Sequence, residues 1–432
     1  MRVAAAEVVY EAALLGARGV LALARPFHAK LARGLEGRRG AVAALEAWAA
    51  AARDPARPLV WVHAPSVGEA LMAQAIVGAL RERRPDLQVA FTHFSPSAER
   101  IAARVGADVH GYLPWDARGP MRRALRALRP AVIAFIRTEV WPVLAREGKR
   151  AGCRVALLNA VLASSSSRLR PAARWALRPA YGRLDAVGAV SAEDAARFPL
   201  LGVEAARVRT TGDARFDQVW ARVQAAGRGG AVAALIERLR AGAGFIVVAG
   251  STWPPDEKAL VPAFARLRDE GRARLIVAPH EPDEAHLAGL ERALDAAGVR
   301  HVRLARVEAG EAPADAVVVD RVGVLADLYA AADAAYVGGG FHAAGLHSVV
   351  EPAALEVPVL FGPRHGNARE AAELAAAGGG RQVADTEELA AALRWLAQDP
   401  DGRAAAGAAA LAFVRSRLGG ARANADLLLE LI

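Results

Sequence analysis

The chain has 432 residues, of which 54% are hydrophobic and 23% charged, a globular composition that excludes a largely disordered chain and favours two domains over one. Its single cysteine, Cys153, excludes an internal disulfide framework and a cysteine-based zinc site, and fits a reducing cytoplasm. The net charge of +9 calls for an acidic partner, but aromatic residues do not interleave with the arginines as they do in nucleic-acid-binding modules, so we expect no nucleic-acid partner.

The first predicted element, within residues 1–40, is a helix with apolar side chains around most of its surface. Glu7, Glu11, Arg18 and Arg25 interrupt it too often for a membrane-spanning segment, and they fall in one narrow stripe of the helix. Four basic residues follow: Lys30, Arg33, Arg38 and Arg39. Such a helix either lies in a membrane interface, with its basic residues facing anionic lipid, or packs on the protein itself.

From Pro58 onward, short apolar runs typical of buried strands alternate with alanine- and leucine-rich helical runs, in two series. The first series is 59–63, 88–93, 131–136, 154–158 and 186–190. The second series is 245–249, 274–278, 316–319, 334–337 and 357–361. The alternation predicts an α/β chain in which each series forms a parallel, doubly wound sheet with crossover helices.

Glycine breakers between the two series place a domain boundary near Gln218. We therefore expect a Rossmann-like domain at residues 41–218 and a second one at 219–405. We also expect a C-terminal helix at 406–432 that packs back on the first domain.

The strand at 59–63 runs straight into Ser66-Val67-Gly68-Glu69, where a helix begins. The S-x-x-E spacing predicts a capping box, in which Ser66 accepts from the backbone of Glu69 and Glu69 reaches back. The same carboxylate follows the carboxyl end of a strand, where open α/β sheets bind ligands, and it could take a proton from a hydroxyl. Gly68 would let a substrate approach the backbone closely.

Two further features of the first domain carry charge. Arg137-Thr138-Glu139 ends the strand at 131–136, and its acid and base form either a salt bridge or part of a site. Five arginines crowd one helical stretch, which is either a solvated helix face or an anion-binding surface. They are Arg118, Arg122, Arg123, Arg126 and Arg129.

Polar turns follow successive strands of the second domain, which predicts that they converge on one crevice. Gly250-Ser251-Thr252-Trp253 opens a helix whose free amides would suit a phosphate, unless Ser251 or Thr252 is simply its N-cap. Gly338-Gly339-Gly340 permits close ligand approach, and Glu351 can accept two hydrogen bonds from a ribose diol; a surface loop is the alternative. The ten histidines include no H-x-x-x-H pair, so we predict no metal site.

Together these motifs resemble those of the 3-deoxy-D-manno-octulosonic acid (Kdo) transferases, which add Kdo to the lipid A precursor. No single motif is decisive, but their order and spacing are specific over nearly the whole chain. The matching segments are 66–69, 112–116, 138–142, 158–160, 211–217, 250–253, 278–281, Asp320 with Gly323 and Tyr329, 338–340, His347 with Glu351 and Pro352, and 362–363.

The resemblance implies a GT-B fold, a CMP-Kdo donor, neither metal nor cofactor, and an inverting displacement. Glu69 would deprotonate the primary hydroxyl of the acceptor glucosamine, which attacks the anomeric carbon of Kdo as CMP departs. Glu139 is the second predicted catalytic residue. The resemblance also implies an enzyme of lipopolysaccharide core biosynthesis at the cytoplasmic face of the bacterial inner membrane, peripheral or N-terminally anchored. Its partners would be the CMP-sugar donor, the phosphorylated lipid A precursor and the membrane surface.

Donor and acceptor sites follow from the same resemblance. The donor-binding residues would be Gly250, Ser251, Thr252, Pro279, His280, Gly339, Gly340, His347, Ser348 and Glu351. The acceptor-binding residues would be Ser66, Gly68, Arg137, Arg122 and Arg123, the arginines fitting the acceptor's phosphates. Arg137, Val161 and Ser348 depart from the family's pattern, in which an acid, an arginine and an asparagine are frequent at these places. Two alternatives are a GT-B transferase or epimerase that uses a UDP-sugar, and a non-catalytic membrane-bound protein that binds nucleotide or lipid.

Overall fold

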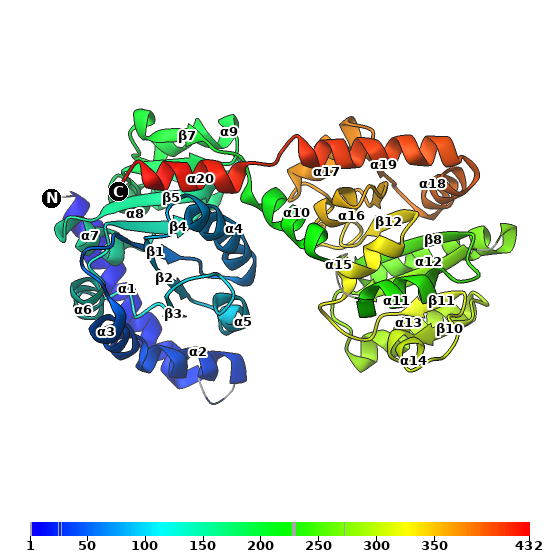
Figure 1. Ribbon diagram of the computed structural model, residues 1–432, viewed down its shortest axis with the longest axis horizontal. Helices are drawn as coiled ribbons and strands as arrows, with labels where there is room; N and C mark the ends of the chain where they lie inside the picture. The colour runs from blue at the N-terminus through cyan, green and yellow to red at the C-terminus, as the bar shows by residue number, and fades with distance from the viewer. Residues whose placement is uncertain (1, 25, 27, 227–229, 272) are drawn as a thin grey trace. The chain divides into compact units, whose positions relative to one another are not determined.

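The computed structural model describes residues 2–24, 26, 28–226, 230–271 and 273–432, and the chain forms two compact units. The first unit runs to Gln218 and includes Leu418–Ile432, and the second is Val219–Arg417. Each unit contains one seven-stranded sheet, flanked by helices (Figure 1). Within each sheet all neighbouring strands are parallel, so the predicted α/β fold with two parallel sheets is confirmed.

The first sheet has the strand order β3-β2-β1-β4-β5-β6-β7, so the order reverses between β1 and β4. The strands are β1 (Leu59–His63), β2 (Gln88–His93), β3 (Val109–Tyr112), β4 (Val132–Ile136), β5 (Arg154–Ala160), β6 (Ala186–Ala189) and β7 (Val208–Thr210). The five predicted strands are all present. The two that the sequence did not predict, β3 and β7, are the edges of the sheet.

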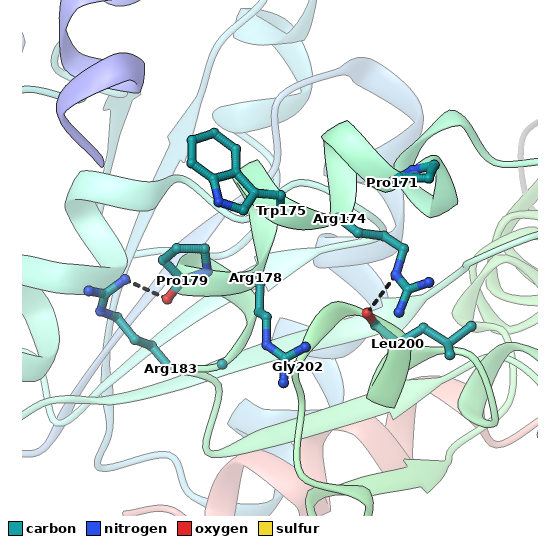
Figure 2. A pocket seen from close by; sticks show the side chains of 9 residues that line it. Pro171, Arg174, Trp175, Arg178, Pro179, Arg183, Leu200 and Gly202 are labelled. Atoms are coloured by element: carbon teal, nitrogen blue, oxygen red, sulfur yellow. Dashed lines mark hydrogen bonds between the residues drawn. The ribbon is translucent and has the colours of Figure 1, made fainter. Parts of the chain in front are cut away.

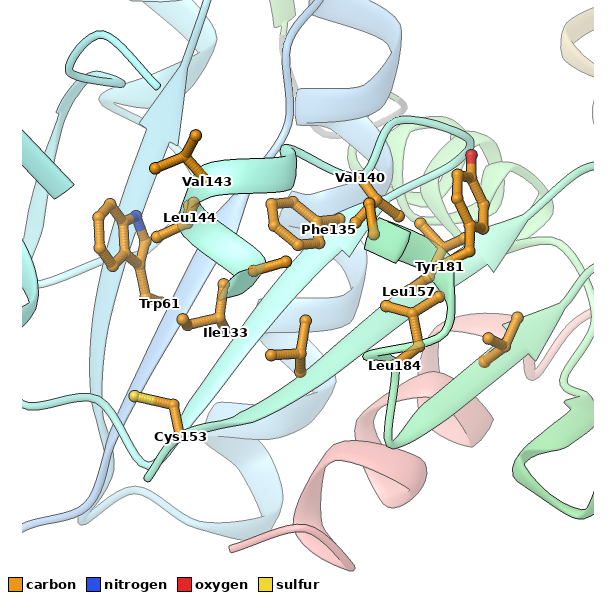
Figure 3. Close-up of a cluster of buried hydrophobic side chains, with 14 of the residues drawn as sticks. Trp61, Ile133, Phe135, Val140, Val143, Leu144, Cys153, Leu157, Tyr181 and Leu184 are labelled. Carbon is orange, nitrogen blue, oxygen red and sulfur yellow. The ribbon is translucent and has the colours of Figure 1, made fainter. Parts of the chain in front are cut away.

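Side chains along each central strand alternate between the two faces of the sheet, as a pleated strand requires. Leu59 and Trp61 of β1 enter one hydrophobic cluster, drawn in Figure 3, and Val60 and Val62 enter the other. The first cluster is covered by α3 (Ala41–Ala52), α6 (Arg118–Leu128), α7 (Pro142–Arg150) and α8 (Pro171–Tyr181). The second is covered by α4 (Val67–Arg83), α5 (Glu99–Ala102) and α20 (Gly420–Leu429).

The helix α1 (Arg2–Ala24) turns its charged stripe toward the protein. Glu7 pairs with Arg146, at 3.0 Å, and with Arg183, while Glu11 lies 2.8 Å from Arg146. The apolar side chains face away from the unit: Val8, Val9, Leu15, Val20 and Leu23 are 57–79% exposed. The helix therefore packs on the protein and at the same time presents an apolar face. None of the described helices is long and apolar enough to cross a membrane.

Two of the basic residues that could face lipid lie in α2 (Ala29–Arg39) and have partners within the first unit. Arg38 is only 7% exposed, and its guanidinium lies 3.6 Å from the centre of the Phe94 ring. Arg33 pairs with Glu99. An orientation toward lipid is wrong for Arg38, which is buried, whereas the Arg33 side chain is 66% exposed and its contact with lipid stays a prediction. Arg25, the last member of the predicted stripe, lies outside the described residues.

Asp116 links α1 to the first turn of α7. Its buried carboxylate accepts hydrogen bonds from the backbone of Val143 at 3.0 Å and Leu144 at 2.8 Å, and from the Tyr10 hydroxyl at 2.8 Å. Burial raises the pKa of Asp116 to about 6, against the effect of these hydrogen bonds. One side chain thus caps α7 and anchors α1.

The second sheet has the strand order β10-β11-β9-β8-β12-β13-β14, which reverses between β8 and β12. The strands are β8 (Phe245–Thr252), β9 (Ala273–Pro279), β10 (His301–Arg303), β11 (Ala316–Val318), β12 (Ala334–Val337), β13 (Val359–Phe361) and β14 (Gly380–Gln382). One face is covered by α12 (Pro254–Glu270), α13 (Glu284–Ala296) and α18 (Thr386–Gln398). The other is covered by α11 (Gly230–Arg240), α14 (Leu304–Glu308) and α15 (Leu325–Leu328).

The C-terminal segment contains two helices, not the single one expected at 406–432. α19 (Pro400–Arg415) belongs to the second unit, where it packs on α16 (Val350–Ala354) and α18. Only α20 packs on the first unit, beside α4 (Figure 1). The break lies at Gly419, whose φ of 106° is left-handed, and Asp217 accepts from its amide at 2.7 Å.

The remaining elements are short or connect these layers. They are α9 (Ala192–Ala195), α10 (Ala214–Ala226), α17 (Arg369–Ala376), η2 (Pro96–Ala98), η3 (Ser167–Leu169), η4 (Phe198–Leu201), η5 (Ala205–Arg207) and η6 (Tyr329–Ala331).

Candidate active site

Both sheets carry predicted site residues at the point where their strand order reverses. In the first unit, Glu69 lies in the helix after β1, and Arg137 and Glu139 follow β4. In the second unit, Ser251 lies at the end of β8, and the glycines 338–340 follow β12. Parallel α/β sheets bind ligands at such reversal points, outside the carboxyl ends of the strands.

Glu69 is held in the capping box of α4, which confirms the box predicted from its spacing. The Ser66 amide donates to Oε2 of Glu69 at 3.0 Å, and the Ser66 hydroxyl donates to the same oxygen at 2.5 Å. The Glu69 amide donates to the Ser66 oxygen at 3.5 Å. No described residue donates a hydrogen bond to Oε1. The cap thus orients the carboxylate and leaves one oxygen open.

The surroundings of Glu69 favour its protonated form, chiefly through burial. Partial burial raises its pKa above the usual glutamate value, and the negative charge of Glu139 raises it further. The hydrogen bonds from Ser66 and the positive charge of Arg137 act in the opposite direction. Glu139 is itself half exposed, with the guanidinium of Arg168 at 3.9 Å. The first unit thus brings Glu69, Glu139 and Arg137 into one electrostatic neighbourhood.

The turns after β4 and β5 hold residues with left-handed backbone. Arg137 has a φ of 76° and Asn159 a φ of 50°, values that cost energy for residues other than glycine and that often mark functional sites. The buried Asn159 amide donates to Asp213 Oδ1 at 3.1 Å, and its oxygen accepts from the Ala214 amide at 2.7 Å. The predicted site omitted Asn159 and Asp213, although both lie in the matched segments.

Gly68 lies exposed in the first turn of α4. A Cβ atom built on it would meet no other heavy atom of the described chain within 4 Å. Packing within the first unit therefore does not require a glycine at this position. Contact between Gly68 or Ser66 and an acceptor stays a prediction.

Arg122 and Arg123 do not join this group. On α6, Arg122 pairs with Glu147 at 2.7 Å and Arg123 with Glu46 at 2.5 Å. Arg122 lines a pocket of about 710 Å³ that also contains Pro130 and Cys153, two residues that precede β4 and β5. Glu69 and Arg137 instead follow strands of this sheet. The strands lie between the two sets of residues, and contact of Arg122 and Arg123 with the acceptor stays a prediction.

In the second unit, the Trp253 ring stacks with two histidines. Its ring centre lies 4.7 Å from that of His280 and 4.3 Å from that of His342. The indole N–H donates to Nε2 of His347 at 3.4 Å. Burial lowers the pKa of His347, and the neighbouring His280 adds to this effect. The predicted residues His280 and His347 therefore lie together, joined by Trp253 and His342, which the prediction omitted.

Asp256 joins the turns after β8 and β12. Its carboxylate is fully buried, and Oδ2 accepts from the amides of Gly339 at 2.8 Å and Trp253 at 3.0 Å. Oδ1 accepts from the Tyr336 hydroxyl at 3.0 Å and the Phe341 amide at 3.1 Å. Four donors on one buried carboxylate fix both turns in place. The prediction missed Asp256, whose position in the first helical turn signals a local cap only.

The predicted donor glycines Gly339 and Gly340 are buried between other turns. A Cβ atom on Gly339, whose φ is 91°, would lie 2.1 Å from the Gly345 oxygen. On Gly340 it would lie 2.4 Å from the Gly362 nitrogen. The packing of the turns therefore requires glycine at both positions. Contact with a donor stays a prediction for these two residues.

The end of β8 differs from expectation. Thr252 is fully buried, and its hydroxyl donates to Glu257 at 2.8 Å, so the expected contact of this side chain with a donor is wrong. Neither Ser251 nor Thr252 caps α12, because Trp253 is the N-cap. The first two helical residues are Pro254 and Pro255, which have no N–H, so two of the expected phosphate-binding amides do not exist.

The other predicted donor residues line the same group of turns. Glu351 is partly exposed, and Arg222 lies 3.4 Å from its Oε1. Burial raises the pKa of Glu351, and the charge of Arg222 opposes the shift. The backbone amide of His280, next to Pro279, donates to the backbone oxygen of Thr252 at 2.9 Å. Over the described ranges no three His, Cys, Asp or Glu side chains are grouped to hold a metal ion, and metal independence stays a prediction.

Two Rossmann-like units with polar turns at both reversal points define a GT-B protein, and the chain is a glycosyltransferase. A family model described as 3-deoxy-D-manno-octulosonic-acid transferase matches residues 35–218. The 3-deoxy-D-manno-octulosonic acid transferase of Bordetella pertussis is 32% identical and aligns with 88% of this chain and 89% of its own. The chain therefore belongs to the Kdo transferase family, which confirms the resemblance found in its sequence.

Other similar proteins agree in family or in fold. The 3-deoxy-D-manno-octulosonic acid transferase of Chlamydophila psittaci is 25% identical, covering 81% of this chain and 79% of its own. The solved structure of UDP-GlcNAc 2-epimerase from Neisseria meningitidis, bound to UDP-GlcNAc, superposes with a TM-score of 0.62 at 11% identity, over 87% of this chain and 99% of that one. At that identity the likeness shows the GT-B fold alone.

Proposed function

We propose that this enzyme transfers Kdo from CMP-Kdo to the lipid A precursor in lipopolysaccharide core biosynthesis, by an inverting displacement with Glu69 as general base. The observation that carries the proposal is the capping box. It holds Oε2 of Glu69 with two hydrogen bonds from Ser66, while none of the described residues bonds Oε1. A base so oriented can accept a proton without leaving its helix. Membership of the Kdo transferase family supports the choice of sugar.

The reaction balances with groups of this chain and its two substrates. The primary hydroxyl of the acceptor glucosamine gives its proton to Oε1 of Glu69, and its oxygen forms a bond to the anomeric carbon of Kdo. The bond between that carbon and the phosphate oxygen breaks on the opposite face, and CMP leaves with the electron pair. The raised pKa of Glu69 makes it a stronger base than an exposed glutamate.

The second unit offers the donor complementary groups. His280 and His347 beside Trp253 can donate hydrogen bonds to the phosphate of CMP, and Glu351 can accept from the ribose hydroxyls. Asp256 holds the turns that carry these groups and does not itself contact the donor in this proposal.

The location at the cytoplasmic face of the inner membrane is part of the proposal. The acceptor is a membrane lipid, and α1 presents an apolar face on the first unit. An amphipathic helix with this exposure binds the interfacial region of a bilayer. We infer peripheral attachment through α1.

Direct transfer and nucleotide binding test the proposal together. The purified chain should transfer Kdo from CMP-Kdo to the tetraacyl disaccharide precursor, and CMP at 100 times its dissociation constant should stabilise it by about 2.7 kcal/mol in thermal unfolding. Stabilisation by UDP alone would reject the CMP-Kdo donor in favour of a UDP-sugar enzyme. Binding of CMP without transfer would favour the non-catalytic alternative.

The charges near Glu69 predict opposite pH shifts in two variants. Glu139→Gln removes a negative charge that raises the pKa of Glu69, so the acidic limb of kcat/KM should move to lower pH. Arg137→Gln removes a positive charge that lowers this pKa, so the limb should move to higher pH. Glu82→Gln, at the exposed far end of α4, is the control and should leave the limb in place. Shifts of both variants in one direction would contradict the assignment of the limb to Glu69.

A further inference from the structure

A pocket of about 730 Å³ opens on the first unit between α8 and the turn that contains η4 (Figure 2). Arg174, Arg178 and Arg183 line it, and its described lining contains no acidic residue. Trp175 and Leu200, which are 45% and 43% exposed, form its apolar part. A pocket with this lining suits an anion that has an apolar portion.

The three arginines differ in the partners that their guanidinium groups already have. Arg183 pairs with Glu7 of α1 and donates to the Pro179 oxygen, so it is a structural link. Arg174 donates through Nε to the Leu200 oxygen at 3.1 Å, which leaves its terminal nitrogens available. Arg178 extends from α8 toward Gly202, and its guanidinium has no acidic partner among the described residues (Figure 2). Arg178, with Arg174 beside it, is therefore the cation available to a ligand.

The apolar surroundings indicate which kind of anion fits. Seven of the ten large hydrophobic side chains that the described chain exposes lie on α1, α8 or η4. They are Val8, Val9, Leu15, Val20, Leu23, Trp175 and Leu200. α1 packs on α8, and Glu7 of α1 pairs with Arg183 of the pocket lining, so the exposed apolar side chains of α1 and the pocket belong to neighbouring elements of the first unit. Tryptophan and arginine beside an apolar helix face are typical of a membrane interface.

We propose that this pocket binds the phosphate-bearing headgroup of an anionic membrane phospholipid. Arg178 and Arg174 donate to the phosphate, while Trp175 and Leu200 contact the region where the headgroup meets the acyl chains. The inference rests on the proposed attachment at the membrane. It adds a specific lipid site, distinct from the residues assigned to catalysis and to the acceptor.

The arginine pocket between α6 and α7 is a weaker candidate for the same role. Two of its arginines, Arg122 and Arg150, already pair with the buried Glu147, at 2.7 and 2.8 Å. No large hydrophobic side chain in its described lining is exposed. It does supply a matched control, because Arg126 is exposed on a helix of the same unit and, like Arg178, has no acidic partner among the described residues.

Binding of the full chain to vesicles tests the proposal. The vesicles are phosphatidylcholine alone, or three parts phosphatidylcholine to one part phosphatidylglycerol, sedimented at one ionic strength. Arg178→Gln should weaken binding to the anionic vesicles about fivefold and leave binding to the neutral ones unchanged. Arg126→Gln, with the same loss of charge, should change either by less than twofold. Equal losses in both variants would overturn the site in favour of a general effect of net charge.

Further experiments distinguish a membrane lipid from a soluble phosphate, and the lipid site from the proposed catalytic function. Soluble glycerol phosphate at millimolar concentration should not displace the wild-type chain from anionic vesicles. If it does, and if Arg178→Gln abolishes this displacement, the pocket binds a soluble anion and the proposed lipid site is overturned. Kdo transfer to detergent-dispersed acceptor should be unchanged in Arg178→Gln. Glu69→Gln should bind vesicles as the wild type does, so loss of transfer and loss of the lipid site are read out separately.

Discussion

Replacement of Glu69 by Gln is expected to lower Kdo transfer by about 10²- to 10⁴-fold, the contribution of a general base. Gln at this position of a capping box keeps the hydrogen bonds to the first turn, so α4 should fold as before. The substitution therefore removes the base and little else. Initial rates with CMP-Kdo and the tetraacyl acceptor, together with the thermal unfolding midpoint, measure both effects.

Ser66→Ala is the complementary variant for this prediction. It removes the hydroxyl that donates to Oε2 of Glu69 but keeps the carboxylate. The loss of the cap should cost about 0.5–2 kcal/mol of stability. Transfer should fall far less than in Glu69→Gln. Wild-type transfer by Glu69→Gln would refute the assignment of Glu69 as the base.

Asp256→Asn is expected to destabilise the second unit by about 1–3 kcal/mol. The buried carboxylate accepts four hydrogen bonds, two on each oxygen. An amide must place its NH₂ group against at least one backbone N–H, because only the Tyr336 hydroxyl can turn to accept, and this leaves buried polar atoms unsatisfied. Because both turns beside Trp253 lose their common anchor, the affinity for CMP should fall as well. Denaturant unfolding and calorimetric titration with CMP measure the two losses.

Asp269→Asn is the matched control for this variant. Asp269 lies near the other end of α12, is 65% exposed, and pairs with its neighbour Arg268. Its replacement should change stability by less than about 0.5 kcal/mol and leave CMP affinity unchanged. Similar results for the two substitutions would mean that the four bonds to Asp256 do not hold the turns.

The interior strands were predictable and the edge strands were not. A strand between two others is buried on both faces, so β1 and β4 read as unbroken apolar runs. The four strands that the sequence did not predict are β3, β7, β10 and β14, and each is the edge of its sheet. Edge strands are short and partly exposed, so their sequences lack the apolar run that marks a buried strand.

Contacts of the candidate site could be predicted from the sequence where the two residues lie close together in the chain. The capping box needs only Ser66 and Glu69, three residues apart, and it is present. Thr252 was assigned wrongly because Ser251 is left-handed and the pairing of β8 with β9 shifts register there, which turns the next side chain inward. Asp256 was missed because three of its four partners lie about 80 residues further along the chain. No pattern in one sequence shows such a contact.

The position of α20 sets the order in which the units can fold during synthesis. Ala425 and Leu428 complete the hydrophobic cluster beneath α4, and Asn424 accepts from the backbone of Asn159 at 3.0 Å. All of the second unit, Val219–Arg417, leaves the ribosome before these residues do. The second unit can therefore finish folding first, although it starts later in the chain. Until α20 emerges, α4, the helix that carries Glu69, covers a sheet face whose hydrophobic cluster is incomplete, so the nascent first unit exposes apolar surface while the second unit folds.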